Sequence, residues 1–75
     1  MKKEIALNKI RKLTTNYIVC KSKKYKLSTT SIKKIIALSL DFADNRFSDK
    51  VDLRDVNYVF EVIVNSICNC LERKN

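Results

Sequence analysis

Glycine, proline and histidine are absent from this sequence of 75 residues. Without glycine there is no glycine-rich phosphate loop. Without histidine there is no histidine metal ligand, no Ser-His-Asp or Cys-His nucleophile and no histidine general base. No apolar run reaches the roughly 18 residues of a membrane span, and no long apolar segment follows Met1-Lys2-Lys3-Glu4 as it would in a secretory signal. We therefore expect neither export nor contact with a membrane.

The charge that is present is strongly basic and unevenly distributed. The chain holds 16 Lys and Arg against 8 Asp and Glu, a formal net charge of +8, and 45% of its residues are apolar, as in a globular domain. Residues 1–34 carry eleven basic residues and one acid, whereas residues 35–75 carry five basic residues and seven acids. This asymmetry predicts one surface suited to a polyanion.

Three cysteines, Cys20, Cys68 and Cys70, are an odd number in a chain with no export signal. This predicts free thiols in a reducing intracellular compartment, the nucleus if the source is eukaryotic. Residues two apart on a helix point about 200° apart, so Cys68 and Cys70 would not share a metal ion. We expect buried or half-buried thiols, no metal site and no cofactor.

Hydrophobic periodicity predicts three helices, over residues 3–19, 29–47 and 53–73. Ser28 opens a Ser/Thr cluster suited to capping the second helix, and Asp52 would cap the third at the amide of Arg54 or Asp55. The apolar positions of the second segment cover an arc of roughly 200°, which indicates a central helix buried on two sides. We expect an all-α fold, a small three- to four-helix bundle forming a single domain over residues 1–75.

Residues 59–64 are rich in β-branched side chains and fit a strand as well as a helix. The length of the segment and the cap at Asp52 favour the helix, and no other segment would supply a partner strand. The predicted core comprises Ile35, Ile36, Phe42, Val59, Phe60 and Ile63. The apolar arcs of the last two helices are too wide for so small a bundle to cover. We therefore expect a partner or self-association on the remaining apolar surface.

Four lysines, Lys21, Lys23, Lys24 and Lys26, lie with Tyr25 in the predicted loop between the first two helices. Lysines give salt-dependent phosphate contacts, and an interleaved tyrosine can stack on a base. Lysine in place of arginine favours charge attraction over base readout. The sequence therefore predicts weak, non-specific nucleic-acid binding by these four lysines. The alternative is a solvated loop in a lysine-rich chain.

Residues 28–69 resemble the helical lid that closes the AAA+ ATPase module of minichromosome maintenance (MCM) replicative helicases. The matching residues, in order, are Ile32, Ile35, Ile36, Leu38 and Ser39, then Ala43, then Arg46-Phe47-Ser48-Asp49, then Val51, and finally Asp55-Val56. The segment 17–21 is similar to the end of the preceding lid helix. Asp55-Val56-Asn57, followed by Val62 and Ser66-Ile67, leans toward the eukaryotic subunit numbered two.

The departures from the family bear on activity. In the lid, an arginine called sensor two reaches the ATP phosphates from a position that corresponds to Thr30 here, and a neutral hydroxyl does not replace a guanidinium. The Walker motifs and the ATPase core are absent. Asp41 and Asp44 form a carboxylate pair, but on the solvent side of the second predicted helix. We therefore expect no enzymatic activity and no catalytic residues.

The resemblance implies a lid-like domain that acts by protein association in DNA replication, with an MCM-type or other replication or chromatin protein as partner. Because the AAA+ lid is akin to the histone fold, a second hypothesis is a small basic histone-fold-like protein that binds DNA as a homo- or heterodimer. The predicted middle helix is about two turns shorter than a histone-fold middle helix.

Overall fold

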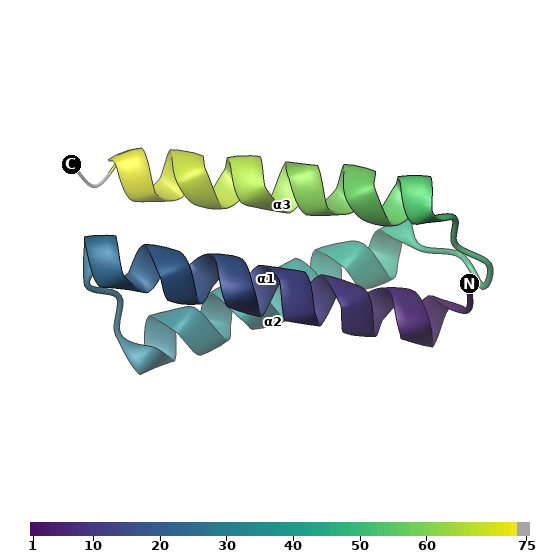
Figure 1. Cartoon of the computed structure of the whole chain (residues 1–75), viewed down its shortest axis with the longest axis horizontal. Helices are drawn as coiled ribbons and strands as arrows, with labels where there is room; N and C mark the ends of the chain where they lie inside the picture. Colours follow the sequence, from purple (N-terminus) through teal and green to yellow (C-terminus); the bar gives the residue numbers. More distant parts are fainter. Residues whose placement is uncertain (74–75) are drawn as a thin grey trace.

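The structure, a computed structural model, describes residues 1–73. It contains three helices, α1 (Lys3–Tyr25), α2 (Thr29–Arg46) and α3 (Leu53–Arg73). α1 and α3 run in the same direction and α2 runs in the opposite one, with a connection at each end of the bundle (Figure 1). The stretch 59–64 lies within α3. The predicted all-α bundle is therefore confirmed, with three helices in the described part of the chain.

α1 continues six residues beyond the end predicted at residue 19. No glycine or proline interrupts it, and Lys23 and Lys24 in its last turn favour the negative end of the helix dipole. The helix stops at Lys26, whose φ of 52° and ψ of 53° are left-handed and whose N–H donates to the Ser22 carbonyl. The chain thus ends this helix with the geometry that usually requires glycine.

The starts of α2 and α3 match their predicted positions, but only one is capped as expected. The Ser28 hydroxyl accepts a hydrogen bond from the Ser31 N–H at 3.1 Å, which confirms the first cap. At α3 the expected direction is wrong: the Asp52 N–H donates to the Asp55 carboxylate at 3.3 Å. The Asp55 side chain therefore reaches back across the first turn, as the side chain at position N3 of a capping box does.

The beginning of the chain is tied to the connection between α2 and α3. The Val51 N–H donates to the Met1 carbonyl at 2.8 Å, and the Lys3 N–H donates to the Asp49 carbonyl at 3.2 Å. The Lys3 ammonium also lies 3.0 Å from the Asp44 carboxylate on α2. This clasp was not predicted, because backbone groups make most of it and leave no pattern in the side chains.

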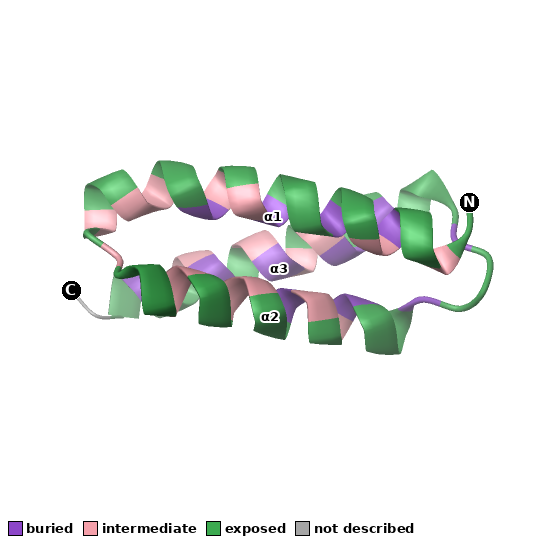
Figure 2. Ribbon diagram, turned by 90° about the horizontal axis from the view of Figure 1, so that it is seen from below, coloured by how far each residue is buried: buried purple, intermediate pink, exposed green. Residues whose placement is uncertain are grey.

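The most deeply buried positions lie on α1. Ala6, Ile10, Thr14 and Ile18 recur every four residues and are all 0% exposed, so they form one stripe. In Figure 2 the buried residues of the three helices face one another across the centre of the bundle. The side chains of α3 that join this core are Val56, Val59, Ile63, Ile67 and Leu71.

The predicted core is only partly correct. Val59 and Ile63 are buried, but the other four predicted core residues, Ile35, Ile36, Phe42 and Phe60, are half-buried against its edge. The second helix is also not the central one: α2 buries only Ser39 and Ala43, and it contacts α3 less than α1 contacts either neighbour. A wide apolar arc predicted two packed sides, whereas α2 packs mainly against α1 and leaves its other apolar side accessible.

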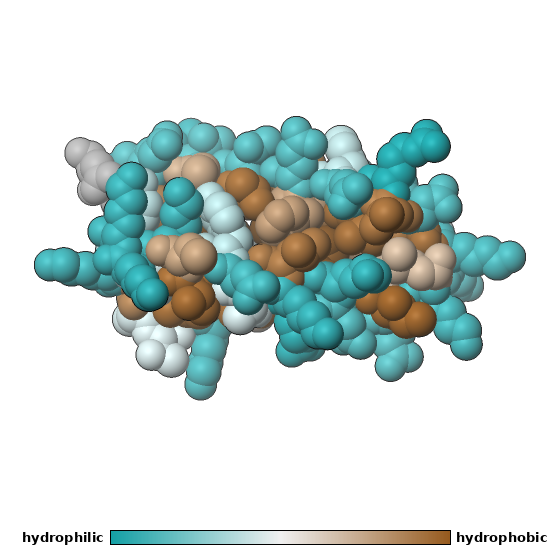
Figure 3. All heavy atoms as spheres, viewed as in Figure 1, coloured by the Kyte–Doolittle hydropathy of each residue, from teal (hydrophilic) through white to brown (hydrophobic). Residues whose placement is uncertain are grey.

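Apolar surface therefore remains exposed, as predicted. A band of hydrophobic atoms runs between α3 and α1 on the face drawn in Figure 3, with hydrophilic side chains on either side of it. The exposed large apolar residues are Met1, Ile5, Leu13, Val19, Leu38, Leu53 and Tyr58. Within the described residues, no helix has the length and hydropathy needed to cross a membrane.

Replacing Thr14 with valine should stabilise the fold. The Thr14 hydroxyl is fully buried and has no hydrogen-bond partner among the described residues. Valine keeps the shape and removes the unpaired polar group, so the free energy of unfolding should rise by about 1 kcal/mol. Urea denaturation measures this change, and Thr15→Val at a half-buried position of α1 is the control. A less stable Thr14→Val protein would show that the hydroxyl is paired, for example by a buried water molecule.

Candidate nucleic-acid interface

The four lysines predicted as a loop lie on a helix end instead. Lys21, Lys23 and Lys24 belong to the last turns of α1, and Lys26 is the residue that ends it. The loop prediction is wrong because α1 runs on to Tyr25. The helix fixes the directions of the first three lysines, so they leave α1 on different sides and do not form one flexible segment.

Two of these lysines lie over aromatic rings of their own helix. The Lys21 ammonium is 5.6 Å from the centre of the Tyr17 ring, and the Lys24 ammonium is 5.5 Å from that of Tyr25. Both distances are within the range of a cation–π contact. Tyr25 is half-buried and packs on the core. Its ring is therefore partly occupied, and stacking on a base, as expected from the sequence, would require it to leave these contacts.

Positive charge is concentrated at one end of the bundle. Residues 17–38 hold six lysines and no acid, and they form the second half of α1, the turn and the first half of α2. In Figure 1 these segments meet at the end of the molecule where α3 terminates. The opposite end contains the connection between α2 and α3, with Asp49, Asp52 and Asp55. The charge asymmetry of the sequence thus becomes an asymmetry along the long axis, which measures 38 Å.

Lys33 joins this end and was not among the predicted site residues. It is exposed on α2 and lines a shallow groove of about 470 Å³ between α1 and α2, together with Arg11 and Thr15 of α1. The pairing of α1 with α2 brings Arg11 and Lys33 together across 22 positions of sequence. Sequence reasoning missed them because neither belongs to the dense cluster at residues 21–26.

We define the lysine end as Lys21, Lys23, Lys24, Lys26 and Lys33.

The carboxylate pair, Thr30 and the three cysteines, which the sequence analysis also considered, differ in their exposure to solvent. Asp41 and Asp44 are exposed, and Asp44 is engaged by Lys3. Thr30 is exposed in the first turn of α2. The expectation for the cysteines is wrong for two of the three: Cys20 and Cys70 are exposed, and only Cys68 is half-buried. Cys20 lies outside the strip that α1 buries, and Cys70 lies on the side of α3 that borders an open groove between α2 and α3.

Cys68 makes the one side-chain hydrogen bond that joins α1 to α3 among residues 1–73. Its sulfur lies 3.0 Å from the Tyr17 hydroxyl, and either group could donate. Burial raises the pKa of Tyr17 to about 12, and the hydrogen bond with Cys68 adds to the effect. Tyr17 therefore supports both Lys21, through its ring, and the packing of α3 at the lysine end.

In comparisons with known proteins, no family model, no curated protein and no solved structure matches this chain. A role for the chain therefore has to be argued from its residues and their arrangement. The arrangement offers two surfaces, the lysine end and the apolar side of α2 that faces away from α1. Among the described residues, no three His, Cys, Asp or Glu side chains gather as a metal site requires.

The stability of the fold should fall at high pH because of Tyr17. Its folded-state pKa of about 12 lies above the ordinary value of 10.0, so the unfolded chain loses the phenol proton first. The contribution is complete below about pH 10 and is lost as the pH rises toward about 12. Urea denaturation across this range should show a steeper loss for the wild type than for Tyr17→Phe. Tyr58→Phe, at an exposed ring, is the control, and equal slopes for wild type and Tyr17→Phe would contradict the assignment.

Glycine at position 26 should stabilise the chain while removing one positive charge. A left-handed conformation costs a residue with a side chain about 1 kcal/mol relative to glycine, so Lys26→Gly should raise the free energy of unfolding by up to that amount. Lys26→Ala removes the same charge but keeps the conformational cost, and it should lack this gain. Thermal or urea denaturation of both variants separates the two effects. Equal stability of the two variants would show that α1 ends differently in solution.

Proposed function

We propose that the chain is a non-catalytic, lid-like helical domain that acts by protein association in DNA replication, with nucleic-acid contact at the lysine end as a secondary property. The observation that carries this proposal is the form of residues 28–56, the stretch with the clearest resemblance to the MCM lid. They make a capped helix, a turn and the start of a second helix, as that resemblance implies.

The turn between these helices supports the proposal in detail. Phe47 and Val51, two of the matched positions, are 6% and 2% exposed, and Val56 in the first turn of α3 is 1% exposed. The matched apolar residues of the turn therefore anchor it to the core, while Ser48 and Asp49 between them remain in solvent.

The position of Thr30 fits a lid without catalytic function. It lies at the exposed start of α2, where the family places the arginine that reaches ATP. Its hydroxyl supplies no positive charge for a γ-phosphate. The proposed role is therefore association with another protein and not nucleotide turnover.

The order of helix lengths favours the lid over the histone-fold hypothesis. α2 has 18 residues and is shorter than α1 with 23 and α3 with 21. A histone fold has its longest helix in the middle, and its two partners cross through those long helices. The lid hypothesis expects a short middle helix that packs against its neighbours within one chain, and α2 has this form.

Nucleic-acid binding at the lysine end is tested by the quadruple replacement of Lys21, Lys23, Lys24 and Lys26 with alanine. Fluorescence anisotropy with short DNA duplexes and single strands should show binding by the wild type at low salt. The variant should bind at least about tenfold more weakly to every sequence. The slope of the logarithm of the binding constant against the logarithm of the salt concentration should fall in magnitude by up to about one unit per lost phosphate contact.

A charge-matched control separates the site from net charge. Replacing Lys2, Lys9, Lys12 and Lys50, which are all exposed, also lowers the formal net charge from +8 to +4. This control should retain most of the affinity. Equal losses in both variants would show that only the overall charge matters, and no wild-type binding at low salt would contradict the nucleic-acid contact altogether.

The association role is tested with purified MCM-type helicase subunits. The chain should bind an ATPase subunit in a direct binding assay while showing no ATP turnover by itself, either as wild type or as Thr30→Arg. Absence of binding to every subunit would argue against the lid-like role, and turnover by the isolated chain would contradict the non-catalytic assignment.

A further inference from the structure

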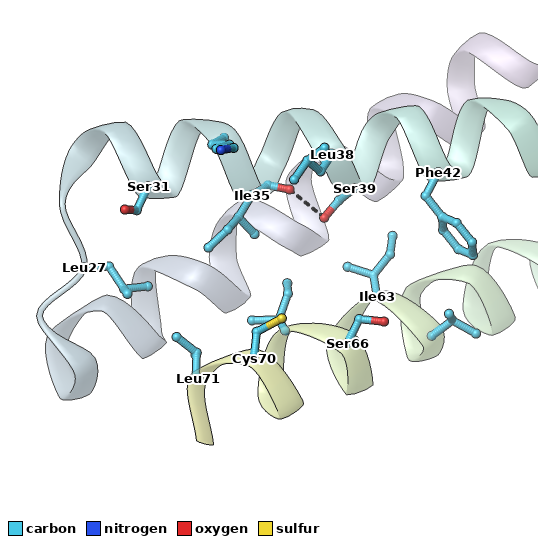
Figure 4. A pocket seen from close by; sticks show the side chains of 13 residues that line it. Leu27, Ser31, Ile35, Leu38, Ser39, Phe42, Ile63, Ser66, Cys70 and Leu71 are labelled. Atoms are coloured by element: carbon cyan, nitrogen blue, oxygen red, sulfur yellow. Dashed lines mark hydrogen bonds between the residues drawn. The ribbon is translucent and has the colours of Figure 1, made fainter. Parts of the chain in front are cut away.

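An open apolar groove separates α2 from α3 along the first half of α2 and the second half of α3. Its volume is about 530 Å³, and α2 contributes Ile35, Leu38 and Phe42 to its wall. In Figure 4, Ile35 and Phe42 point from α2 toward α3, and Ile63 and Cys70 point from α3 toward α2. Closely packed helices leave no gap of this size, so the groove is apolar surface that the bundle itself does not cover.

Leu38 stands at the rim of this groove. Its side chain is 59% exposed, although it belongs to the apolar arc of α2. Lys34 precedes it by four residues and Asp41 follows it by three, so successive turns of the helix carry a cation, an apolar residue and an anion along one side. Lys34 and Asp41 have no ion-pair partner among residues 1–73, where the pair between Lys3 and Asp44 is the one the structure shows.

We propose that this groove is the self-association surface of the chain, and that two copies pack antiparallel through α2 with Leu38 of each copy in the groove of the other. The proposal deepens the association role above, because it names the surface and a second copy of this chain as the partner. It rests on the order Lys34, Leu38, Asp41 and on the apolar groove beside them.

A twofold axis that passes near Leu38 makes the charges complementary. In an antiparallel pair, a residue four positions before the axis on one helix lies near residues three to four positions after it on the other. Lys34 of each copy then faces Asp41 of the other, and the contact occurs twice, as in any isologous interface. Both residues lie on the same flank of Leu38, so the two ion pairs form at the rim while the leucines meet at the centre.

The charge along the whole molecule favours the same orientation. Residues 17–38 hold six lysines and no acid, whereas residues 41–62 hold six acids and three basic residues. An antiparallel pair through α2 places Lys33 and Lys34 in the first half of one α2 beside Asp41 and Asp44 in the second half of the other, whereas a parallel pair would bring two lysine ends together. The lysine ends of the antiparallel dimer lie at opposite extremities and stay free for nucleic acid.

Sedimentation equilibrium at low salt tests the surface with two matched leucines. Leu38 and Leu53 are both 59% exposed, but only Leu38 lines the groove. The wild type should dimerise, Leu38→Glu should weaken dimerisation at least about tenfold because it buries a carboxylate, and Leu53→Glu should change it by no more than about threefold. Circular dichroism shows whether each variant keeps its helices, which is expected since both positions are exposed.

A charge exchange tests the register. Lys34→Asp or Asp41→Lys alone should weaken dimerisation about tenfold, because like charges then meet twice in each dimer. The double variant K34D/D41K restores opposite charges in the two contacts and should recover the wild-type affinity to within about threefold.

Several results would overturn the proposal. A wild-type protein that is monomeric up to millimolar concentration would leave the groove for a different occupant, such as a helix of another protein. A dimer that survives Leu38→Glu but is lost with Leu13→Glu would place the contact on the face between α1 and α3. A double variant as weak as the single ones would exclude the antiparallel register. None of these outcomes changes the lysine-end test or the helicase-subunit test, so the two proposals fail separately.

Discussion

The stripe of Ala6, Ile10, Thr14 and Ile18 holds both other helices against α1. Its members recur every four residues, so they drift around the helix by about 40° at each step and present successive positions to α2 and α3. The small side chains of Ala6 on α1 and Ala43 on α2 allow close approach between helices. α2 and α3 each pack mainly against α1 and contact each other less. The groove between α2 and α3 follows from this arrangement.

The two surfaces with a proposed role arise in different ways. The lysine end depends on chain direction, since the end of α1 and the beginning of α2 must meet at the turn between them. The groove depends on how the helices diverge away from the clasp that joins the N-terminal residues to residues 49–51. Hydrogen bonds secure the clasped end, whereas the lysine end carries the exposed positive charge. The groove reaches the lysine end, since Leu27, Ser31 and Lys34 line it, so polyanion contact and protein contact would use adjoining surfaces.

The candidate site shows where reasoning from the sequence succeeds and fails. The cluster at residues 21–26 is visible in the sequence because its lysines are contiguous. Its helical form is not visible, because the left-handed stop at Lys26 has no glycine to mark it. Lys33 and Arg11 join the basic surface only through the packing of α1 on α2. The position of Lys21 over the Tyr17 ring likewise depends on the helix, which brings residues four apart onto one side.

The sequence by itself determined the helical class, the capped start at Ser28, the start of the third helix at Leu53 and the excess of apolar surface. These properties follow from local spacing and from composition, which a periodic pattern records. Only the tertiary structure decided that α1 is the central helix, that Ile35, Ile36, Phe42 and Phe60 lie at the margin of the core, and that residues 1–3 clasp residues 49–51. An apolar arc measures how much of a helix avoids water. Which neighbour covers that arc depends on the directions in which whole helices cross, and these are set by contacts between residues far apart in the chain.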